Sequence, residues 1–89
     1  MGSISDLKAK TIITNIRKIR EFRDYTQDYL AAKLNISQNA YSKIELGYSS
    51  ITVARLVQIA ELLEVDLAAL VSANSEEIIR HELTLKQAK

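Results

Sequence analysis

The chain has no cysteine, no proline and no tryptophan, and it has only one histidine and two glycines. The lack of cysteine excludes disulfides and thiolate metal sites. The sequence contains no usual set of catalytic residues, because it has one histidine, no glycine-rich phosphate loop and no carboxylate pair on an apolar face. We therefore expect a protein that is not an enzyme, with no metal, no cofactor and no evident small-molecule ligand.

Long hydrophobic runs are absent as well. No apolar stretch approaches the roughly 20 residues that cross a bilayer. The start, Met-Gly-Ser, has no apolar region of a signal peptide. No expected helix combines a basic face with a broad aromatic one, as a helix on a membrane surface would. We therefore expect a cytoplasmic protein without a membrane partner.

The length and composition indicate one small helical domain. The chain has 89 residues, of which 47% are hydrophobic, and this suits a single modest core. Few glycines, no proline and little alternation of β-branched residues favour an all-α fold. The net charge is only +1, but residues 8–23 are rich in lysine and arginine, whereas many acidic residues follow residue 60. Any attraction to a polyanion must therefore come from the distribution of charge.

The middle of the chain has the pattern of two short helices joined by a tight turn. Thr26 is a good N-cap for the first helix. Leu30, Ala31 and Leu34 then form one apolar face, and the small Ala31 allows two helices to approach closely. Asn35 tolerates the left-handed conformation that ends a helix. The pattern predicts a first helix over residues 27–34.

The second helix is predicted over residues 38–46, with Ser37 as its N-cap and Gly47 as its left-handed stop. Tyr41 and Ile44 are expected to face the core. The outward face carries four polar residues, namely Gln38, Asn39, Ser42 and Lys43. Amphipathic helices commonly have a polar face, so this stripe alone means little. The ordered caps, small residue, short turn and glycine stop favour a helix-turn-helix, and the stripe could then bind base edges or phosphates.

A family resemblance rests on these residues. Its motifs are Thr26-Gln27, Leu30-Ala31, Ile36-Ser37-Gln38, Tyr41-Ser42-Lys43-Ile44-Glu45 and Gly47. In this order they resemble the helix-turn-helix of the lambda-repressor/Cro-like (Xre) family of DNA-binding domains, and the similarity extends from Arg17 to about Val71. The resemblance implies a compact five-helix domain over residues 11–71. Residues 1–10 would be an N-terminal extension and 72–89 a tail or dimerisation helix.

The resemblance also implies one structural pair and exposes two departures. An arginine at the position of Arg20 pairs in this family with the glutamate that is Glu45 here. Such a pair can be bidentate, and it would tie the first helix to the recognition helix. Asp24 and Glu64 stand where relatives have glycine. Asp24 can adopt the left-handed conformation with some strain, and the turn at Glu64 is either left-handed or built differently.

Two further helices should complete the core. Thr52 is placed to cap a helix over residues 53–63, and Asp66 is placed to cap a fifth helix. Arg55 and Gln58 are expected on the outer, solvated side. The inward apolar stripe of the fourth helix is predicted to be Val53, Leu56, Ala60 and Leu63. The first helix should begin near Asp6 or near Thr11.

The last segment, residues 72–89, lies beyond the resemblance. Asn74 and Glu77 have the spacing of a capping box. An imperfect apolar stripe follows, made of Ile78, Ile79, Leu83 and Leu85. Two alternatives stay open: a frayed tail, or a possible sixth helix that packs on a second copy, because relatives commonly dimerise through C-terminal elements.

The leading hypothesis is a sequence-specific regulator of transcription, a repressor, that binds double-stranded DNA with helix 38–46 in the major groove. The predicted base-reading residues are Gln38, Asn39, Ser42 and Lys43. The predicted phosphate contacts are Gln27, Ser37, Arg17, Tyr48 and Ser49. The loop 48–51 lacks the basic residues common in the family, so we expect a shallow salt dependence. A homodimer would require a near-palindromic operator with half-sites roughly 34 Å apart.

The alternative is a protein-interaction module, such as an antitoxin-like protein or an accessory subunit, that uses the same fold. The low net charge, the uncharged loop 48–51 and an exposed Leu46 favour it. Binding of duplex DNA at moderate salt without a partner would distinguish the two hypotheses.

Overall fold

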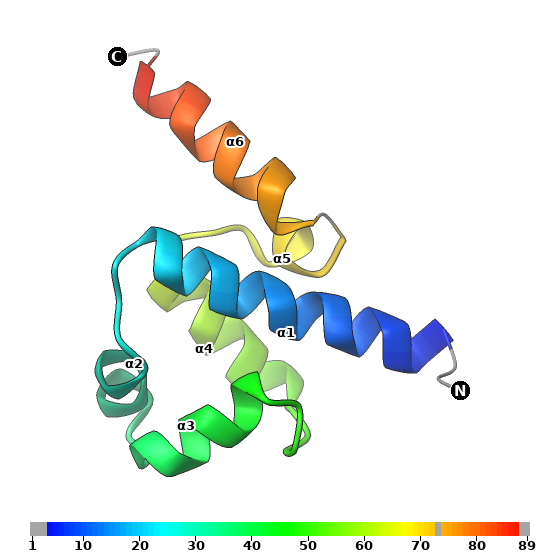
Figure 1. The fold of residues 1–89 in the computed structure, drawn as a ribbon, viewed down its shortest axis with the longest axis vertical. Coiled ribbons are helices and arrows are strands. Elements are labelled where there is room, and N and C mark those ends of the chain that lie inside the picture. The colour runs from blue at the N-terminus through cyan, green and yellow to red at the C-terminus, as the bar shows by residue number, and fades with distance from the viewer. Residues whose placement is uncertain (1–3, 73, 88–89) are drawn as a thin grey trace.

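The computed structural model describes residues 4–72 and 74–87, which form six α-helices around one core (Figure 1). The helices are α1 (Ile4–Phe22), α2 (Gln27–Leu34), α3 (Gln38–Glu45), α4 (Val53–Leu63), α5 (Leu67–Ser72) and α6 (Ser75–Gln87). The predicted all-α fold is confirmed, and the possible sixth helix is present. Within these residues no helix is long and apolar enough to cross a membrane.

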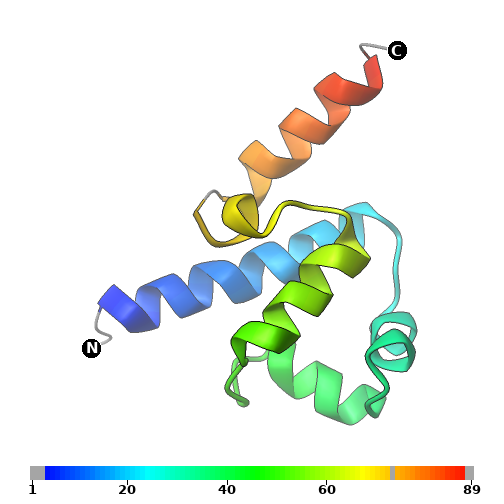
Figure 2. The same ribbon diagram turned by 180° about the vertical axis from the view of Figure 1, so that it is seen from behind.

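The helix α1 is the centre of the arrangement. It crosses the molecule and contacts α3, α4, α5 and α6. Figure 2 shows α4 lying at an angle to α1. It already begins at Ile4, earlier than either predicted start, so the expected boundary between residues 10 and 11 falls inside a continuous helix. Residues 1–3 of the expected extension lie outside the described residues.

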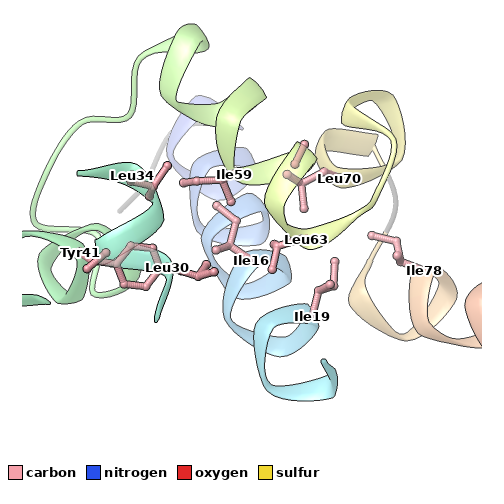
Figure 3. Packing of buried hydrophobic residues seen from close by; sticks show 11 residues of the cluster. Ile16, Ile19, Leu30, Leu34, Tyr41, Ile59, Leu63, Leu70 and Ile78 are labelled. Carbon is pink, nitrogen blue, oxygen red and sulfur yellow. The ribbon is translucent and has the colours of Figure 1, made fainter. Parts of the chain in front are cut away.

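Every helix contributes to the core (Figure 3). The labelled buried side chains are Ile16 and Ile19 of α1, Leu30 and Leu34 of α2, Tyr41 of α3, Ile59 and Leu63 of α4, Leu70 of α5 and Ile78 of α6. Ala31 is also buried, as expected for a close helix crossing. The core prediction is wrong for Val53, which is 76% exposed. Val53 is the first residue of α4, and this end of the helix lies outside the core.

The predicted N-caps satisfy N–H groups in the first turns of the helices through their side-chain oxygens. Four caps accept a backbone N–H, and they are Thr26 from Tyr29 (2.9 Å), Ser37 from Ala40 (3.0 Å), Thr52 from Arg55 (3.1 Å) and Asn74 from Glu77 (2.9 Å). Each bond satisfies a donor that the first turn leaves without a partner. At α5 the backbone carbonyl of Asp66 accepts from the N–H of Leu70 at 3.0 Å.

Four helices are followed by a residue in the left-handed conformation. Three of these residues are not glycine: Asp24 (φ 59°), Asn35 (φ 60°) and Glu64 (φ 58°). The fourth is Gly47 (φ 78°), two residues after the end of α3. Of the two alternatives for Glu64, the left-handed one is therefore correct. Arg23 stabilises this turn, because its guanidinium donates to the carbonyls of Leu63 at 2.8 Å and Glu64 at 3.3 Å.

The helix α6 packs against α1 and α5 of its own chain. Ile78 and Ser75 are buried there, and Glu82 pairs with Arg23 of α1 at 3.3 Å. Ser72 ends α5, and residues 75–87 form a docked helix and not a frayed tail. Residues 73 and 88–89 of the predicted segment lie outside the described residues. Leu83 and Leu85 remain exposed on α6.

Arg55 differs from its expected solvated position. Its guanidinium is partly buried and donates to the carbonyl of Leu34 and to the amide oxygen of Gln58, both at 3.2 Å. It therefore holds α4 against the C-terminus of α2. A sequence pattern places Arg55 on the outer face of α4, but it does not show that the end of another helix lies within reach.

Replacing Glu64 with glycine should stabilise the protein. The left-handed conformation costs a non-glycine residue about 1–2 kcal/mol. Glycine removes this strain, but the greater entropy of glycine in the unfolded chain offsets part of the gain in stability. We expect Glu64→Gly to raise the free energy of unfolding by about 0.5–1 kcal/mol in urea denaturation. Glu61→Gly is the matched control, because Glu61 is exposed inside the same helix. This substitution should lower the free energy of unfolding by about 1 kcal/mol. Equal losses in both variants would contradict the assigned turn.

Candidate nucleic-acid interface

The helix α3 has one buried and one exposed face. Tyr41, Ile44 and Glu45 are buried. On the other face Gln38, Asn39 and Lys43 are exposed, and Ser42 is half-buried. The four predicted base-reading residues therefore lie together on one helix, with Ser42 closest to the protein body. The helix ends at Glu45, one residue before its predicted end, and Leu46 is its C-cap.

The predicted phosphate-contacting residues surround this helix. Ser37 lies at the N-terminus of α3, and exposed Tyr48 and Ser49 follow its C-terminus. Gln27 is half-buried at the N-terminus of α2. Arg17 is exposed on α1 one turn before Arg20, which faces α3, so Arg17 borders the same side.

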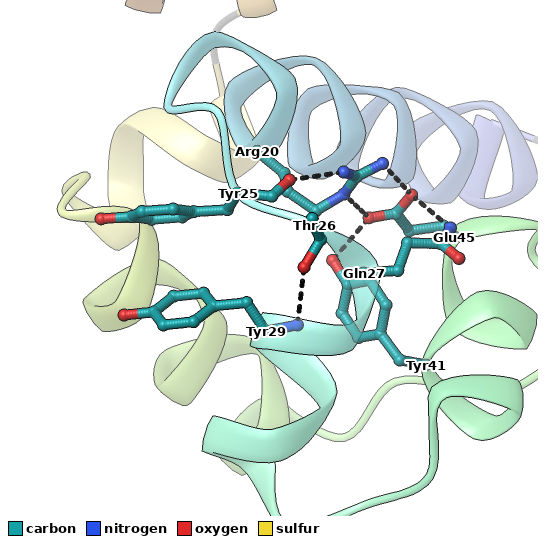
Figure 4. A network of polar contacts seen from close by, with 7 residues as sticks. All are labelled: Arg20, Tyr25, Thr26, Gln27, Tyr29, Tyr41 and Glu45. Atoms are coloured by element: carbon teal, nitrogen blue, oxygen red, sulfur yellow. Dashed lines mark hydrogen bonds and ion pairs between the residues drawn. The ribbon is translucent and has the colours of Figure 1, made fainter.

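A bidentate ion pair joins α1 to α3 (Figure 4). The Nε of Arg20 lies 2.7 Å from Oε2 of Glu45, and its Nη2 donates to Oε1 at 3.2 Å. The remaining Nη1 donates to the carbonyl of Tyr25 at 2.7 Å. The side chains of Arg20 and Glu45 are only 11% and 3% exposed. The structure thus contains the pair that the resemblance implies.

The carboxylate of Glu45 accepts two more hydrogen bonds. The hydroxyl of Tyr41 donates to Oε2 at 2.6 Å, and the amide of Gln27 donates to Oε1 at 3.1 Å. Tyr41 precedes Glu45 by four residues, and this spacing could have predicted their contact from sequence. The bond from Gln27 could not be predicted in this way, because it depends on how α2 and α3 cross.

This network shifts the acid–base properties of its members. Burial acts to raise the pKa of Glu45, but hydrogen bonds from Arg20, Tyr41 and Gln27 outweigh it and hold the pKa below its usual value. The hydrogen bond to Glu45 raises the pKa of Arg20, although burial opposes this. Burial, followed by the bond to Glu45, raises the pKa of Tyr41. At neutral pH the pair is therefore charged and the phenol is protonated.

The network positions the side chain of Gln27. One N–H of its amide donates to Glu45, while an amide has a second N–H and an oxygen that can bind another group. Gln27 opens α2, where backbone N–H groups and the helix dipole favour an anion. The arrangement suits contact with a phosphate at the edge of the exposed face of α3.

Comparison with known proteins agrees with this geometry. A family model described as Helix-turn-helix matches residues 16–70, from the middle of α1 to α5. The chain belongs to the helix-turn-helix family. This finding confirms the resemblance to lambda-repressor-like domains, and the matched region includes α2, α3 and all four predicted base-reading residues.

A relative of the helix-turn-helix protein described here is the "Uncharacterized HTH-type transcriptional regulator YqaE" of Bacillus subtilis (strain 168). The two sequences are 35% identical over 63 residues, which cover 71% of this chain and 54% of the relative. The chain thus spans about half the length of that relative. No solved structure matches the chain significantly.

Removing the charge of Glu45 should lower stability in a pH-dependent way. Breaking one partner of a buried pair costs on the order of 3 kcal/mol, and we expect this loss for Glu45→Gln at pH 7. The folded pKa of Glu45 is lowered, so its stabilisation is complete above the unfolded pKa of about 4.3 and is lost as the pH falls through the folded pKa. The difference between wild type and variant should therefore shrink below about pH 4.3.

Urea denaturation at several pH values between 7 and 3 would measure this difference. Glu61→Gln is the control, because it removes an exposed carboxylate from α4 and should change stability by less than about 0.5 kcal/mol. A Glu45→Gln variant as stable as wild type at pH 7 would contradict the role given to the network.

Proposed function

We propose that this chain is a sequence-specific regulator of transcription that binds double-stranded DNA and acts as a repressor. One observation carries the proposal: two amides, a hydroxyl and an ammonium occupy the outer face of α3, which a buried ion pair fixes to α1. Membership in the helix-turn-helix family supports it, as does the printed name of the relative, a transcriptional regulator. Repression would follow from occupation of the operator.

In this proposal α3 enters the major groove and its side chains read bases. The amides of Gln38 and Asn39 can each donate to and accept from an adenine edge, and Lys43 can donate to the acceptors of guanine. All three are exposed. Ser42 is half-buried, so its short hydroxyl reaches only a base or phosphate that comes close to the helix.

Contacts to the backbone would fix the register of α3 in the groove. Gln27 would bind a phosphate with the amide N–H that Glu45 does not use. Ser37, Tyr48 and Ser49 would contribute hydroxyls, and Arg17 a charge. Because hydroxyls displace no counterions, the slope of log K against log salt should be smaller than in a relative with a basic loop.

A single α3 reads few base pairs, so we propose that two copies bind together. A homodimer would recognise a near-palindromic operator whose half-sites lie about one helical turn, roughly 34 Å, apart. Selection from a random duplex library would test this directly. A palindromic product would support the dimer, and a single half-site would contradict it.

A protein-interaction module remains the second candidate. The observation that favours it is the exposed apolar surface next to α3, where Leu46 and Tyr48 face solvent. Duplex binding at moderate salt in the absence of any partner, abolished by substitutions in α3, would decide for DNA. If those variants bind duplex DNA as well as wild type does, or if wild type binds no duplex, the result would decide against DNA binding through α3.

Lys43→Ala tests base reading. We expect a loss of about 1–3 kcal/mol in binding the selected duplex, together with relaxed preference at one base pair. Fluorescence anisotropy on the selected site and on single-base variants would measure both effects. Lys33→Ala is the matched control, because Lys33 is an exposed lysine on α2 beside the ring of Tyr29, outside the stripe. Equal losses on every sequence would show that Lys43 contacts phosphate only.

Gln27→Ala tests the phosphate contact. The variant should weaken binding to all duplexes alike, by about 1 kcal/mol or roughly fivefold, and leave base preference unchanged. Its melting temperature should be recorded as well, because Gln27 also bonds Glu45. A change in base preference would argue that Gln27 reads a base; unchanged affinity would rule out its contact with DNA.

A further inference from the structure

A half-open groove of about 410 Å³ lies between α6 and the start of α5. Its apolar lining is formed by Val65 and Ala69 on one side and by Ile78 and Leu85 of α6 on the other. Ile78 and Leu85 are seven residues apart, so they share one face of the helix. Ile78 is 6% exposed, whereas Leu85 is 50% exposed. The apolar lining therefore extends from the core to solvent and leaves a large side chain uncovered.

The groove is acidic as well as apolar. Its ionisable lining residues are Asp66, Glu77, His81 and Glu82, and among the described residues no lysine or arginine lines it. Glu82 pairs with Arg23 of α1, but Asp66 and Glu77 are exposed. The Oε1 of Glu77 accepts a hydrogen bond from the neutral amide of Asn74 at 3.0 Å, which does not cancel its charge. Two carboxylates thus offer negative charge beside an apolar surface.

Both walls of the groove are fixed to α1. The buried amide of Asn15 donates to the carbonyl of Leu70 at 2.9 Å and so holds α5. Arg23 of α1 pairs with Glu82 at 3.3 Å and holds α6, which also buries Ile78 in the core. A partner would therefore meet a groove that is already formed, and this lowers the entropic cost of binding.

These properties select one kind of occupant. An amphipathic helix can place its apolar face in a groove of this kind, and basic residues on its flanks would be attracted by the carboxylates. A second copy of the chain fits less well, because a two-fold contact would bring the same carboxylates together. Nucleic acid fits less well for a similar reason, since its phosphates would face negative charge.

We propose that the groove between α5 and α6 is a docking site for a basic amphipathic helix of a partner protein. Apolar side chains of that helix would cover Leu85, and its lysines or arginines would pair with Asp66 and Glu77. Figures 1 and 2 show α6 and α3 on opposite sides of α1. The site therefore leaves the outer face of α3 free, and the inference does not depend on the proposed function.

A synthetic helical peptide tests the proposal. The probe is a fluorescent peptide of about 16 residues with leucines on one face and lysines elsewhere. The comparison peptide carries glutamates in place of the lysines. Fluorescence anisotropy with the full chain should show binding of the lysine peptide at least about tenfold tighter than that of the glutamate peptide, because only the first complements the carboxylates.

Two pairs of variants locate the site. Asp66→Asn combined with Glu77→Gln should weaken binding of the lysine peptide about fivefold, while asparagine and glutamine preserve capping at these helix starts. Glu61→Gln combined with Glu76→Gln is the matched control, because it removes two exposed carboxylates outside the groove and gives the same net charge. This control should bind as wild type does.

The second pair tests the apolar contact. Leu85→Ser should weaken binding about tenfold, because it removes a side chain that the peptide would cover. Leu83→Ser should leave binding unchanged, because Leu83 is about as exposed (46%) but does not line the groove. Both leucines are exposed, so thermal melting should show both variants folded.

Three results would overturn the proposal. They are no binding of the lysine peptide by wild type, equal binding of the two peptides, and equal losses in the groove variants and their controls. Sedimentation of wild type would reveal the other occupant: a dimer that is lost in Leu85→Ser would place a second copy in the groove. A protein that binds the peptide at this site but no duplex would support the groove and contradict the proposed function, so the two failures are distinguishable.

Discussion

The carboxylate of Glu45 is the point on which the geometry of the first three helices depends. It is 3% exposed, and a buried charge is costly unless it is paired and hydrogen-bonded. Its partners come from three helices: Arg20 from α1, Gln27 from α2 and Tyr41 from α3 itself (Figure 4). Hydrogen bonds from three helices to one carboxylate therefore constrain how these helices lie relative to one another. A small displacement of α3 would leave a buried charge short of donors.

The apolar core cannot supply this precision alone. Burial of Ile16, Leu30 and Tyr41 holds the helices together, but apolar contact is nondirectional. The helix α3 has eight residues, too few for stability in isolation. Packing thus stabilises the helix, while the ion pair fixes its direction. This division suits a recognition helix, whose side chains must meet an external surface in a fixed register.

Local features could be predicted from the sequence because they depend on neighbouring residues. The caps at Thr26, Ser37 and Thr52 and the left-handed Asn35 belong to this class. The pair of Arg20 and Glu45, 25 residues apart, is implied only by the family resemblance. Without that resemblance, helical periodicity would place each of the two residues at the edge of a helix face. It would not predict that they contact each other.

The features that could not be predicted depend on where helices end and cross. Val53 has the spacing of a core residue, but it lies in the first turn of α4 and projects into solvent. Arg55 has the spacing of a solvated residue, but the C-terminus of α2 lies within its reach. The packing of α6 on its own α1 is of the same kind, since the apolar stripe alone fits either an internal or an external partner.

The structure also changes the meaning of the basic stretch at residues 8–23. Arg20 is committed to Glu45, and Arg23 is engaged with Glu82 and with the carbonyls that end α4. Four other cations of this stretch remain exposed, and they are Lys8, Lys10, Arg17 and Lys18. Two of the arginines thus stabilise the fold and are not available to a polyanion. The count of charges in the sequence therefore overstates the number of cations available for the proposed contact with DNA.

The segment that follows α3 adds no further cation. With no charge on residues 46–54, the surface that follows α3 gains little from phosphates, since affinity for the DNA backbone comes mainly from cations. Linking two weak sites raises their combined affinity without any new contact to DNA. If two copies bind as proposed, each contributes a weak site, and the pair supplies the affinity that the free cations of one copy do not.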